Sequence, residues 1–177
     1  MMEADAIAIE TVTAAAVREA VPALARVLAD CVANGASLGF MHWNTRADYE
    51  RFWEGVAADV EAGRTVLFAA RRDGEIVGTA QLHLIGKPNQ PHRAEIAKVL
   101  VHSTARRQGL GETLMGAAEA AARAAGRTLL VLDTDADSAA RRLYRRLGWT
   151  EVGTIPRFAL MPDGADCAST FFYKALD

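Results

Sequence analysis

The chain has 177 residues, of which 51% are hydrophobic and 24% are charged, the composition of an ordinary globular protein with one sizeable core. A net charge of −2 gives no overall positive field for nucleic acid, no apolar run reaches the ~20 residues of a membrane span, and the acidic N-terminus lacks a secretory signal. The two cysteines fit no metal or redox spacing. We therefore expect one domain over residues 1–177, a cytoplasmic monomer or homodimer with free thiols, and no membrane or nucleic-acid partner.

Hydrophobic periodicity and turn residues divide the first half of the chain into five elements. They are a strand over 6–12, helices over 14–33 and 45–62, and strands over 64–71 and 75–85 joined by an Asp-Gly hairpin turn. Pro22 lies inside the first helix, so we expect a break there, with Pro22 in the first turn of the main helix. A loop over 35–44 connects the two helices.

The second half of the chain alternates strands and helices. The predicted elements are a strand over 93–102, a helix over 108–125, a strand over 128–134, a helix over 138–147, and two paired strands over 149–158 and 170–176. Because the 93–102 and 128–134 strands are joined through a helix, they should be parallel. This order predicts an α/β fold: a mixed sheet with helices on both faces, and ligands beyond the carboxyl ends of the parallel strands.

The stretch from Val99 to Gly111 is the most informative part of the sequence. An apolar strand runs into a turn with the spacing Arg106-x-x-Gly109-x-Gly111, and an Ala-rich helix follows directly. Main-chain N–H groups converge at such a turn, and the positive end of the helix dipole favours a phosphate group. The turn matches neither the P-loop nor the dinucleotide-binding fingerprint. A plain strand-to-helix connection is the alternative.

This turn and a second motif resemble those of the GNAT family of N-acetyltransferases. The family has Arg/Gln-x-x-Gly-x-Gly/Ala after a strand, and residues 139–149 are similar to its second signature, a helix with a tyrosine before a Leu-Gly-aromatic stop. The resemblance implies an α+β fold with a mostly antiparallel sheet in which the two parallel strands splay apart. Further segments resemble the branch of the family that contains the tabtoxin resistance protein, which implies antibiotic resistance. They are residues 35–41, 87–89, 93–95, 132–134 and 162–164.

The family resemblance also implies acetyl-coenzyme A as cosubstrate, with no metal. Main-chain groups of Val99 and Val101 would hold the pantetheine arm as a strand edge does, and the glycine turn would hold the pyrophosphate. The predicted cofactor-binding residues are Val99, Val101, Arg106, Arg107, Gln108, Gly109, Gly111, Glu112 and Thr113. For the side chains of the two arginines, a solvated role is equally open.

Two features of the following helix bear on the cofactor. Four arginines lie within residues 141–146, and such a cluster favours a solvent-facing role, with one arginine near the ribose phosphate as the alternative. Asp137 stands where the family often has an asparagine that bonds the pantetheine, and an ionised aspartate cannot donate that bond.

The resemblance to the family implies three candidate catalytic residues. Glu95 and Asp133 match positions of general bases, which would take a proton from the acceptor amine, and a buried setting would raise their pKa. The alternatives are a surface charge at Glu95 and a turn cap at Asp133. Tyr144 is the candidate general acid for the departing thiolate, with a core tyrosine as the alternative.

The acceptor pocket should be formed by the 35–44, 86–92 and 155–169 segments, with Ser37, Phe40 and His42 as substrate residues. We expect acetyl transfer to a primary amine or hydroxyl of a small amino-acid-like compound or antimetabolite. A protein or peptide N-acetyltransferase and a non-catalytic acyl-coenzyme A sensor are the other hypotheses. The spacing of acidic and histidine residues gives neither a calcium loop nor a zinc site, and no serine has the context of a hydrolase nucleophile.

Overall fold

Seven strands form one sheet in the computed structural model, which describes residues 7–176 of the chain. In chain order the elements are β1 (Ala8–Val12), α1 (Ala14–Ala33), α2 (Arg46–Glu61), β2 (Thr65–Arg72), β3 (Glu75–Leu84), β4 (Arg93–Val101), a short 3-10 turn η1 (Ser103–Ala105), α3 (Leu110–Ala124), β5 (Leu129–Asp135), α4 (Ala139–Arg146), β6 (Thr150–Leu160) and β7 (Asp166–Ala175). Ala6, the predicted start of the first strand, lies outside the described residues.

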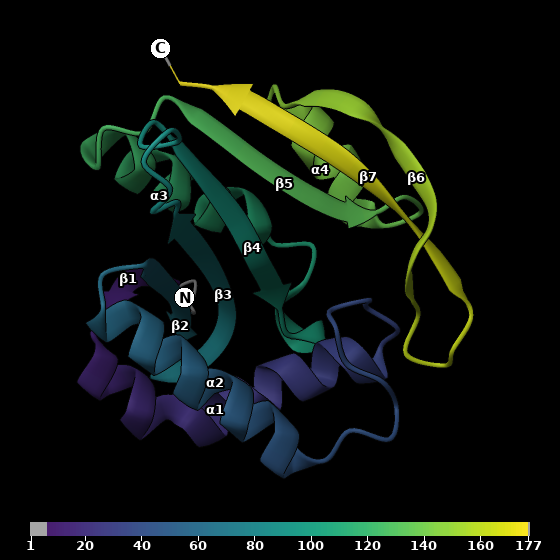
Figure 1. Cartoon of the computed structure of the whole chain (residues 1–177). Coiled ribbons are helices and arrows are strands. Elements are labelled where there is room, and N and C mark those ends of the chain that lie inside the picture. Colours follow the sequence, from purple (N-terminus) through teal and green to yellow (C-terminus); the bar gives the residue numbers. More distant parts are fainter. Residues whose placement is uncertain (1–6, 177) are drawn as a thin grey trace, which may run out of the picture.

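The strands follow the order β1-β2-β3-β4-β5-β7-β6 across the sheet (Figure 1). All neighbouring strands are antiparallel except β4 and β5, which are parallel. The mixed, mostly antiparallel sheet predicted from the sequence is therefore confirmed.

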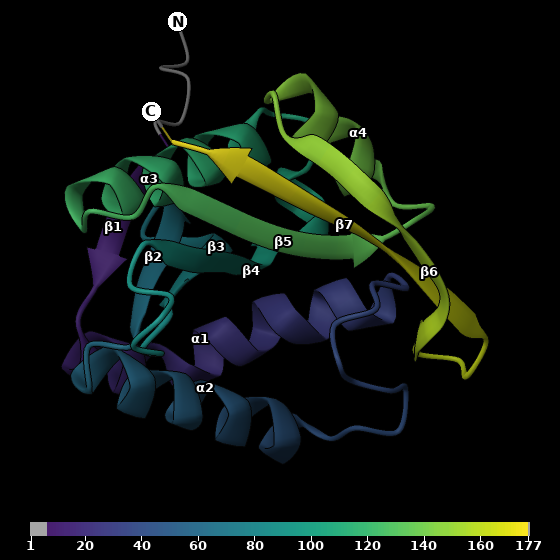
Figure 2. The same ribbon diagram turned by 45° about the horizontal axis from the view of Figure 1, so that its top comes forward.

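Helices cover both faces of the sheet, again as predicted (Figure 2). On one face, Leu24 of α1 and Trp53 of α2 belong to the same buried cluster as Leu67 of β2. On the other face, Leu114 of α3 shares a second buried cluster with Phe172 of β7. The sheet therefore separates two cores, and a ligand that enters between its strands would reach both sides.

Helix α1 runs without interruption through Pro22, so the predicted break at this residue is wrong. The helix buries Val17 and Val21 before the proline, and Leu24 and Leu28 after it, in one continuous core. Pro22 itself faces solvent, where its ring and its missing N–H disturb only the outer side of the helix. The packing of one apolar face on both sides of Pro22 thus outweighs the ~3 kcal/mol that a proline costs in a helix interior.

The last two strands are longer than the sequence predicts. β7 begins at Asp166 rather than at residue 170, because pairing with β6 resumes at Ala159 and Cys167 after a register shift. Arg157 lies in the shifted segment with a left-handed φ of 52°. The β6–β7 ribbon therefore reaches the loop between α1 and α2 (Figure 1).

Two absences can be stated for residues 7–176. No helix there is long and apolar enough to cross a membrane. In the same residues, no group of three or more His, Cys, Asp or Glu side chains is arranged to hold a metal ion. Cys31 and Cys167 are buried free thiols.

Candidate active site

The sheet is forked between β4 and β5. Their parallel pairing joins Arg93–Glu95 to Leu129–Val131, and within the described residues it extends no further, so the predicted splayed pair is present. On the other edge of β4, the N–H of His102 donates to the carbonyl of Val77 at 2.9 Å. Because hydrogen-bonded and non-bonded pairs alternate along antiparallel strands, the N–H and C=O of Val101 point away from β3 and into the fork.

A bulge in β4 decides which side chains face each side of the fork. Lys98 and Val99 together oppose one residue of β3, and Lys98 has a left-handed φ of 50°. In a regular strand the third residue after Glu95 would face the opposite side, but the bulge turns Lys98 to the side of Glu95. The Lys98 ammonium accordingly lies over the ring of Phe52 in α2, 5.6 Å from its centroid, whereas Val99 packs against the core of α3 and α4.

The glycine turn that precedes α3 has the backbone of an anion nest. Arg107 and Gly109 have left-handed φ values of 61° and 76°, and Gly109 caps the helix without a side chain to occupy its first N–H groups. At Gly109 the requirement is conformational, because a Cβ there would meet nothing within 4 Å. At Gly111 a Cβ would lie 3.1 Å from Leu143 of α4, so this glycine allows the two helices to pack closely.

A cavity of about 810 Å³ joins the fork to this turn. It is lined by Val99, Val101, Arg106, Arg107, Gly109, Gly111 and Glu112, which are seven of the nine predicted cofactor residues. The other two side chains are engaged elsewhere: Gln108 accepts a bond from Arg72 at 3.5 Å, and the Thr113 hydroxyl donates to the carbonyl of Gly109 at 3.2 Å. The sequence therefore located this cavity correctly in its larger part.

Other residues line the cavity that the motifs could not indicate. They come from the end of α1, the loop that follows it, the end of β5 and the start of α4, and they include Cys31, Asn34, Leu38, Asp135 and Ser138. They lie far from the glycine turn in sequence, and only the packing of α1 and α4 beside β4 brings them to it. Asp137 does not belong to the residues that line it.

Arg106 does not point freely to solvent. Its Nε donates to the carbonyl of Val101 at 3.1 Å, and its guanidinium lies 4.0 Å from the carboxylate of Asp30. The same carboxylate accepts two bonds from Ser103, each 2.7 Å long, and these bonds outweigh burial and hold the pKa of Asp30 below its usual value. Arg106 thus ties the end of β4 to α1, and the carbonyl of Val101 is already occupied while its N–H is aimed at the fork.

The four arginines of α4 divide into two pairs. Arg141 and Arg145 bind Glu151 of β6, the former at 2.6 Å. Arg142 and Arg146 line the cavity instead. Both are exposed, so the solvent-facing role expected for the cluster holds for them, and the helical spacing of four residues puts them together at the open edge of the cavity.

The two predicted bases lie on the α1–α2 side of the fork. Glu95 pairs with Val131, and Asp133 follows two residues later, so their carboxylates face the same side of the sheet. The carboxylate of Glu95 accepts a bond from Arg93 at 2.5 Å, and its side chain is 43% exposed. Asp133 is exposed and accepts a bond from the Ser169 hydroxyl at 2.6 Å. Neither carboxylate is therefore in the buried setting that the sequence left open.

Tyr144 reaches the fork from the opposite face. Its ring packs against Trp149 and Phe172, and the residue is only 5% exposed. Burial, assisted by the Asp133 carboxylate, raises the pKa of Tyr144 to about 12. The hydroxyl forms no hydrogen bond with any other described residue, and the residue lines the cavity, so a protonated donor is available to a ligand there.

The three predicted substrate residues lie in the loop between α1 and α2. The Ser37 hydroxyl donates to the carbonyl of Leu160 at 2.8 Å, and the N–H of His42 donates to the carbonyl of Pro162 at 3.0 Å. Phe40 packs on α2, with its ring 5.6 Å from that of Phe52. The loop and the β6–β7 turn therefore form one continuous cover beside the fork.

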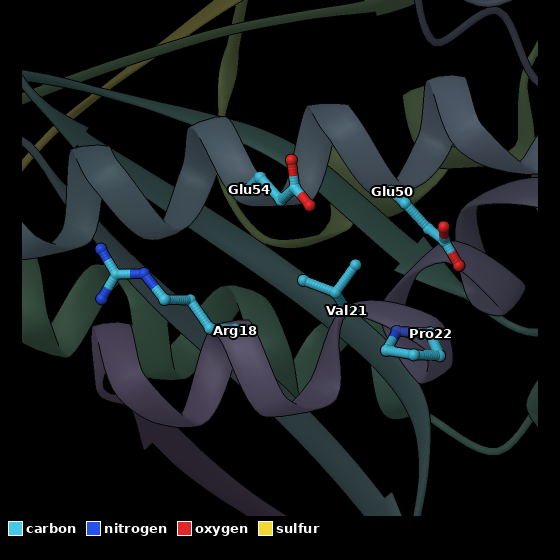
Figure 3. A pocket seen from close by; sticks show the side chains of 5 residues that line it. All are labelled: Arg18, Val21, Pro22, Glu50 and Glu54. Carbon is cyan, nitrogen blue, oxygen red and sulfur yellow. The ribbon is translucent and has the colours of Figure 1, made fainter.

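A second hollow of about 560 Å³ lies between α1 and α2, away from the fork (Figure 3). Arg18, Val21 and Pro22 line one side of it, and Glu50 and Glu54 line the other. None of the motif residues contributes to it.

Comparison with known proteins identifies the family. The model of the acetyltransferase (GNAT) family matches residues 29–149. An uncharacterized N-acetyltransferase from the hisH-hisA intergenic region of Azospirillum brasilense is 38% identical over 106 residues, which are 59% of this chain and 61% of that protein. An IAA acetyltransferase of Azospirillum brasilense is 33% identical over 108 residues, 60% of this chain and 65% of that protein. The chain thus spans less than two thirds of the length of these curated relatives.

Solved structures share the fold over nearly the whole chain. A ribosomal-protein-alanine N-acetyltransferase from Brucella melitensis is 28% identical with a TM-score of 0.78, and the match covers 96% of this chain and 99% of that one. The yncA protein of Salmonella typhimurium, solved with acetyl-CoA, is 22% identical with a TM-score of 0.79, covering 97% of this chain and 95% of that one. The family match spans more than half of the chain and includes the glycine turn, the fork and α4, so the chain belongs to the GNAT family of acetyltransferases.

Proposed function

We propose that this protein transfers the acetyl group of acetyl-CoA to the amine of a small, amino-acid-like acceptor. The observation that carries this proposal is the fork: β4 and β5 separate after Glu95, and the main-chain N–H of Val101 is aimed into the gap beside a cavity of about 810 Å³. A thioester arm needs such a strand edge, because its amides can bond to the unpaired main chain.

The cavity has the chemistry that the rest of the cofactor requires. Its nest, from Arg107 to Glu112, supplies N–H groups at a helix N-terminus for the pyrophosphate. Arg142 and Arg146 supply positive charge for the remaining phosphate. When the cofactor binds, the Arg106 guanidinium would either release the carbonyl of Val101 and bind a phosphate, or keep that hydrogen bond. In the second case the main-chain N–H groups alone would bind the pyrophosphate. The solved neighbour that holds acetyl-CoA supports this arrangement through its shared fold.

The proposed acetyl transfer uses groups from both faces of the fork: the two carboxylates on the α1–α2 side and Tyr144 on the other. The acceptor amine attacks the thioester carbon as a neutral group, and Glu95 or Asp133 takes its proton directly or through a water molecule. The N–H of Val101 stabilises the oxyanion of the tetrahedral intermediate. The protonated hydroxyl of Tyr144, which no other described residue engages, then donates a hydrogen bond to the departing thiolate.

A small acceptor is supported by the cover over the α1–α2 side of the fork. The bonds from Ser37 to Leu160 and from His42 to Pro162 join the two segments that would have to part for a long peptide. The sequence similarity to the tabtoxin resistance branch supports an amino-acid-like acceptor as well, and resistance to such a toxin is the biological role that it would imply.

A second candidate, transfer to the N-terminus of a protein, is favoured by one observation. The ribosomal-protein-alanine N-acetyltransferase from Brucella melitensis is 28% identical to this chain over nearly its full length. A peptide acceptor would need the cover to open at the β6–β7 turn. A direct competition assay between amino acids and peptides that begin with alanine distinguishes the two candidate functions.

The test is a thiol-release assay of the purified protein with acetyl-CoA and a panel of amino acids, amines and alanine peptides, together with calorimetry of coenzyme A binding. We expect binding and acetylation of a small acceptor. Binding without thiol release for any acceptor would indicate a sensor, and no binding would refute the proposed cofactor.

Glu95→Gln tests the base. It should lower kcat on the order of 100-fold at pH 7, and the loss should shrink as the pH approaches the pKa of the acceptor amine, which then needs no base. Glu54→Gln, which removes a carboxylate from the exposed face of α2, is the matched control. An unchanged kcat for Glu95→Gln would remove this residue from the mechanism.

A further inference from the structure

The strand next to β4 carries a row of polar side chains on the α1–α2 side of the sheet. Thr79, Gln81 and His83 occupy alternate positions of β3 on this face, where a strand ordinarily carries apolar side chains, and the first two are buried. Gln81 is only 2% exposed, and its Nε2 has no hydrogen-bond partner among the residues that the structure describes. Its Oε1 is 2.9 Å from Nε2 of His83. A buried amide that keeps free donors is costly, and this one lies beside Ala97, next to the bulge.

The ammonium of Lys98, in the bulge of β4 beside this polar row, has no counter-ion. Two other half-buried cations of the sheet do bind a carboxylate: Lys174 binds Glu119 at 2.8 Å, and Arg93 binds Glu95 at 2.5 Å. Lys98, which is half-buried, has no ion pair and no acceptor for its Nζ anywhere in residues 7–176; the face of Phe52 lies beside it, and the Asp133 carboxylate is near enough to act on its charge.

The bulge maintains this unpaired charge at a cost to the fold. A left-handed φ at a non-glycine residue is unfavourable, and an ammonium without a partner loses part of its hydration in addition. Burial lowers the pKa of Lys98, and the nearby Asp133 carboxylate opposes that shift only in part. A half-buried ammonium with neither an ion pair nor a hydrogen-bond acceptor is suited to an anionic ligand.

We propose that Lys98, which lies beside the polar row of β3, binds a carboxylate of the acceptor, which makes the substrates amino acids rather than polyamines, aminoglycosides or neutral amines. This inference rests on the proposed function. Lys98 and Glu95 face the same side of β4, three residues apart, so one binds the acceptor's negative group while the other receives the proton of its amine. Phe40 and Phe52 cover the same side and would enclose the acceptor's apolar part.

The experiment compares each L-amino acid that the wild type acetylates with its carboxamide, which has the same side chain and no negative charge. A charge-assisted bond predicts a kcat/KM for the acid about 10- to 100-fold above that for the amide. Lys98→Met, which keeps the alkyl contact with Phe52, should raise KM for the acid to the level of the amide and leave the amide unchanged. Lys98→Arg should restore part of the preference.

Two controls keep the outcomes distinct. Arg123→Met removes one positive charge from the exposed end of α3 and should leave the preference intact. Coenzyme A binding by calorimetry, measured on each variant, verifies that the folded cofactor site is preserved.

Three outcomes would overturn the inference while coenzyme A still binds: equal rates for acids and amides, no transfer to any amino acid, or a Lys98→Met variant that loses kcat equally for both. The last would indicate stabilisation of the oxyanion by Lys98. Absence of coenzyme A binding in the wild type would instead refute the proposed function itself.

Discussion

The buried hydroxyl of Tyr144 predicts a specific loss of stability at high pH. Its pKa is raised from 10.0 to about 12 in the folded protein. Between these values the unfolded chain releases this proton while the folded chain keeps it. The contribution to the free energy of unfolding is therefore complete below pH 10 and is lost as the pH rises through 12. Two pKa units correspond to a total of nearly 3 kcal/mol.

Tyr144→Phe removes the titrating group and retains the ring that packs on Trp149 and Phe172. Urea unfolding from pH 8 to 11 should show that the wild type loses about 1 kcal/mol more than the variant by pH 11. Tyr173→Phe removes a hydroxyl at a position that is 41% exposed and serves as the control. If the difference between wild type and Tyr144→Phe stayed constant over this range, the inference that burial raises the pKa of Tyr144 would be wrong.

Two further substitutions test the core and the cofactor cavity. Glu119→Ala leaves the ammonium of Lys174 without a counter-charge under α3 and should cost about 3–5 kcal/mol in urea unfolding, whereas Arg18→Ala at an exposed pair should cost less than ~1 kcal/mol. Similar costs for the two variants would contradict this account of the buried pair. Arg142→Ala should weaken coenzyme A binding about tenfold in calorimetry and leave dephospho-coenzyme A unaffected, and equal weakening of both ligands would exclude a contact with the ribose phosphate.

Most of the fold could be predicted from local signals in the sequence. The apolar strand before the glycine turn, the Ala-rich helix after it, and the second apolar strand indicated the parallel pair that forms the fork. The error at Pro22 has a tertiary cause, because the packing of α1 on the sheet decides whether the helix continues. The early start of β7 depends on a shifted register near Arg157, which no alternation of side chains reveals.

The site could be predicted only where it is continuous in the chain. The nest from Arg106 to Gly111 has a sequence spacing, so its residues were identified before the structure. Lys98 was not, because a period of two assigns it to the face opposite Glu95, and only the bulge reverses that assignment. The loop residues beside the fork and the arginines of α4 that line the cavity depend on how distant elements pack, which short-range patterns do not record.

The brief ladder between β4 and β5 has a thermodynamic consequence. In the described residues, the main-chain pairing that joins the half-sheet of β1–β4 to the half-sheet of β5–β7 is limited to Arg93–Glu95 with Leu129–Val131 and the bonds to the carbonyl of His92 just before them. A pantetheine arm that forms hydrogen bonds with the main chain of both β4 and β5 would link the two half-sheets where their own pairing has ended. Cofactor occupancy should therefore raise the melting temperature and slow amide exchange in both halves at once, coupling substrate supply to the lifetime of the enzyme.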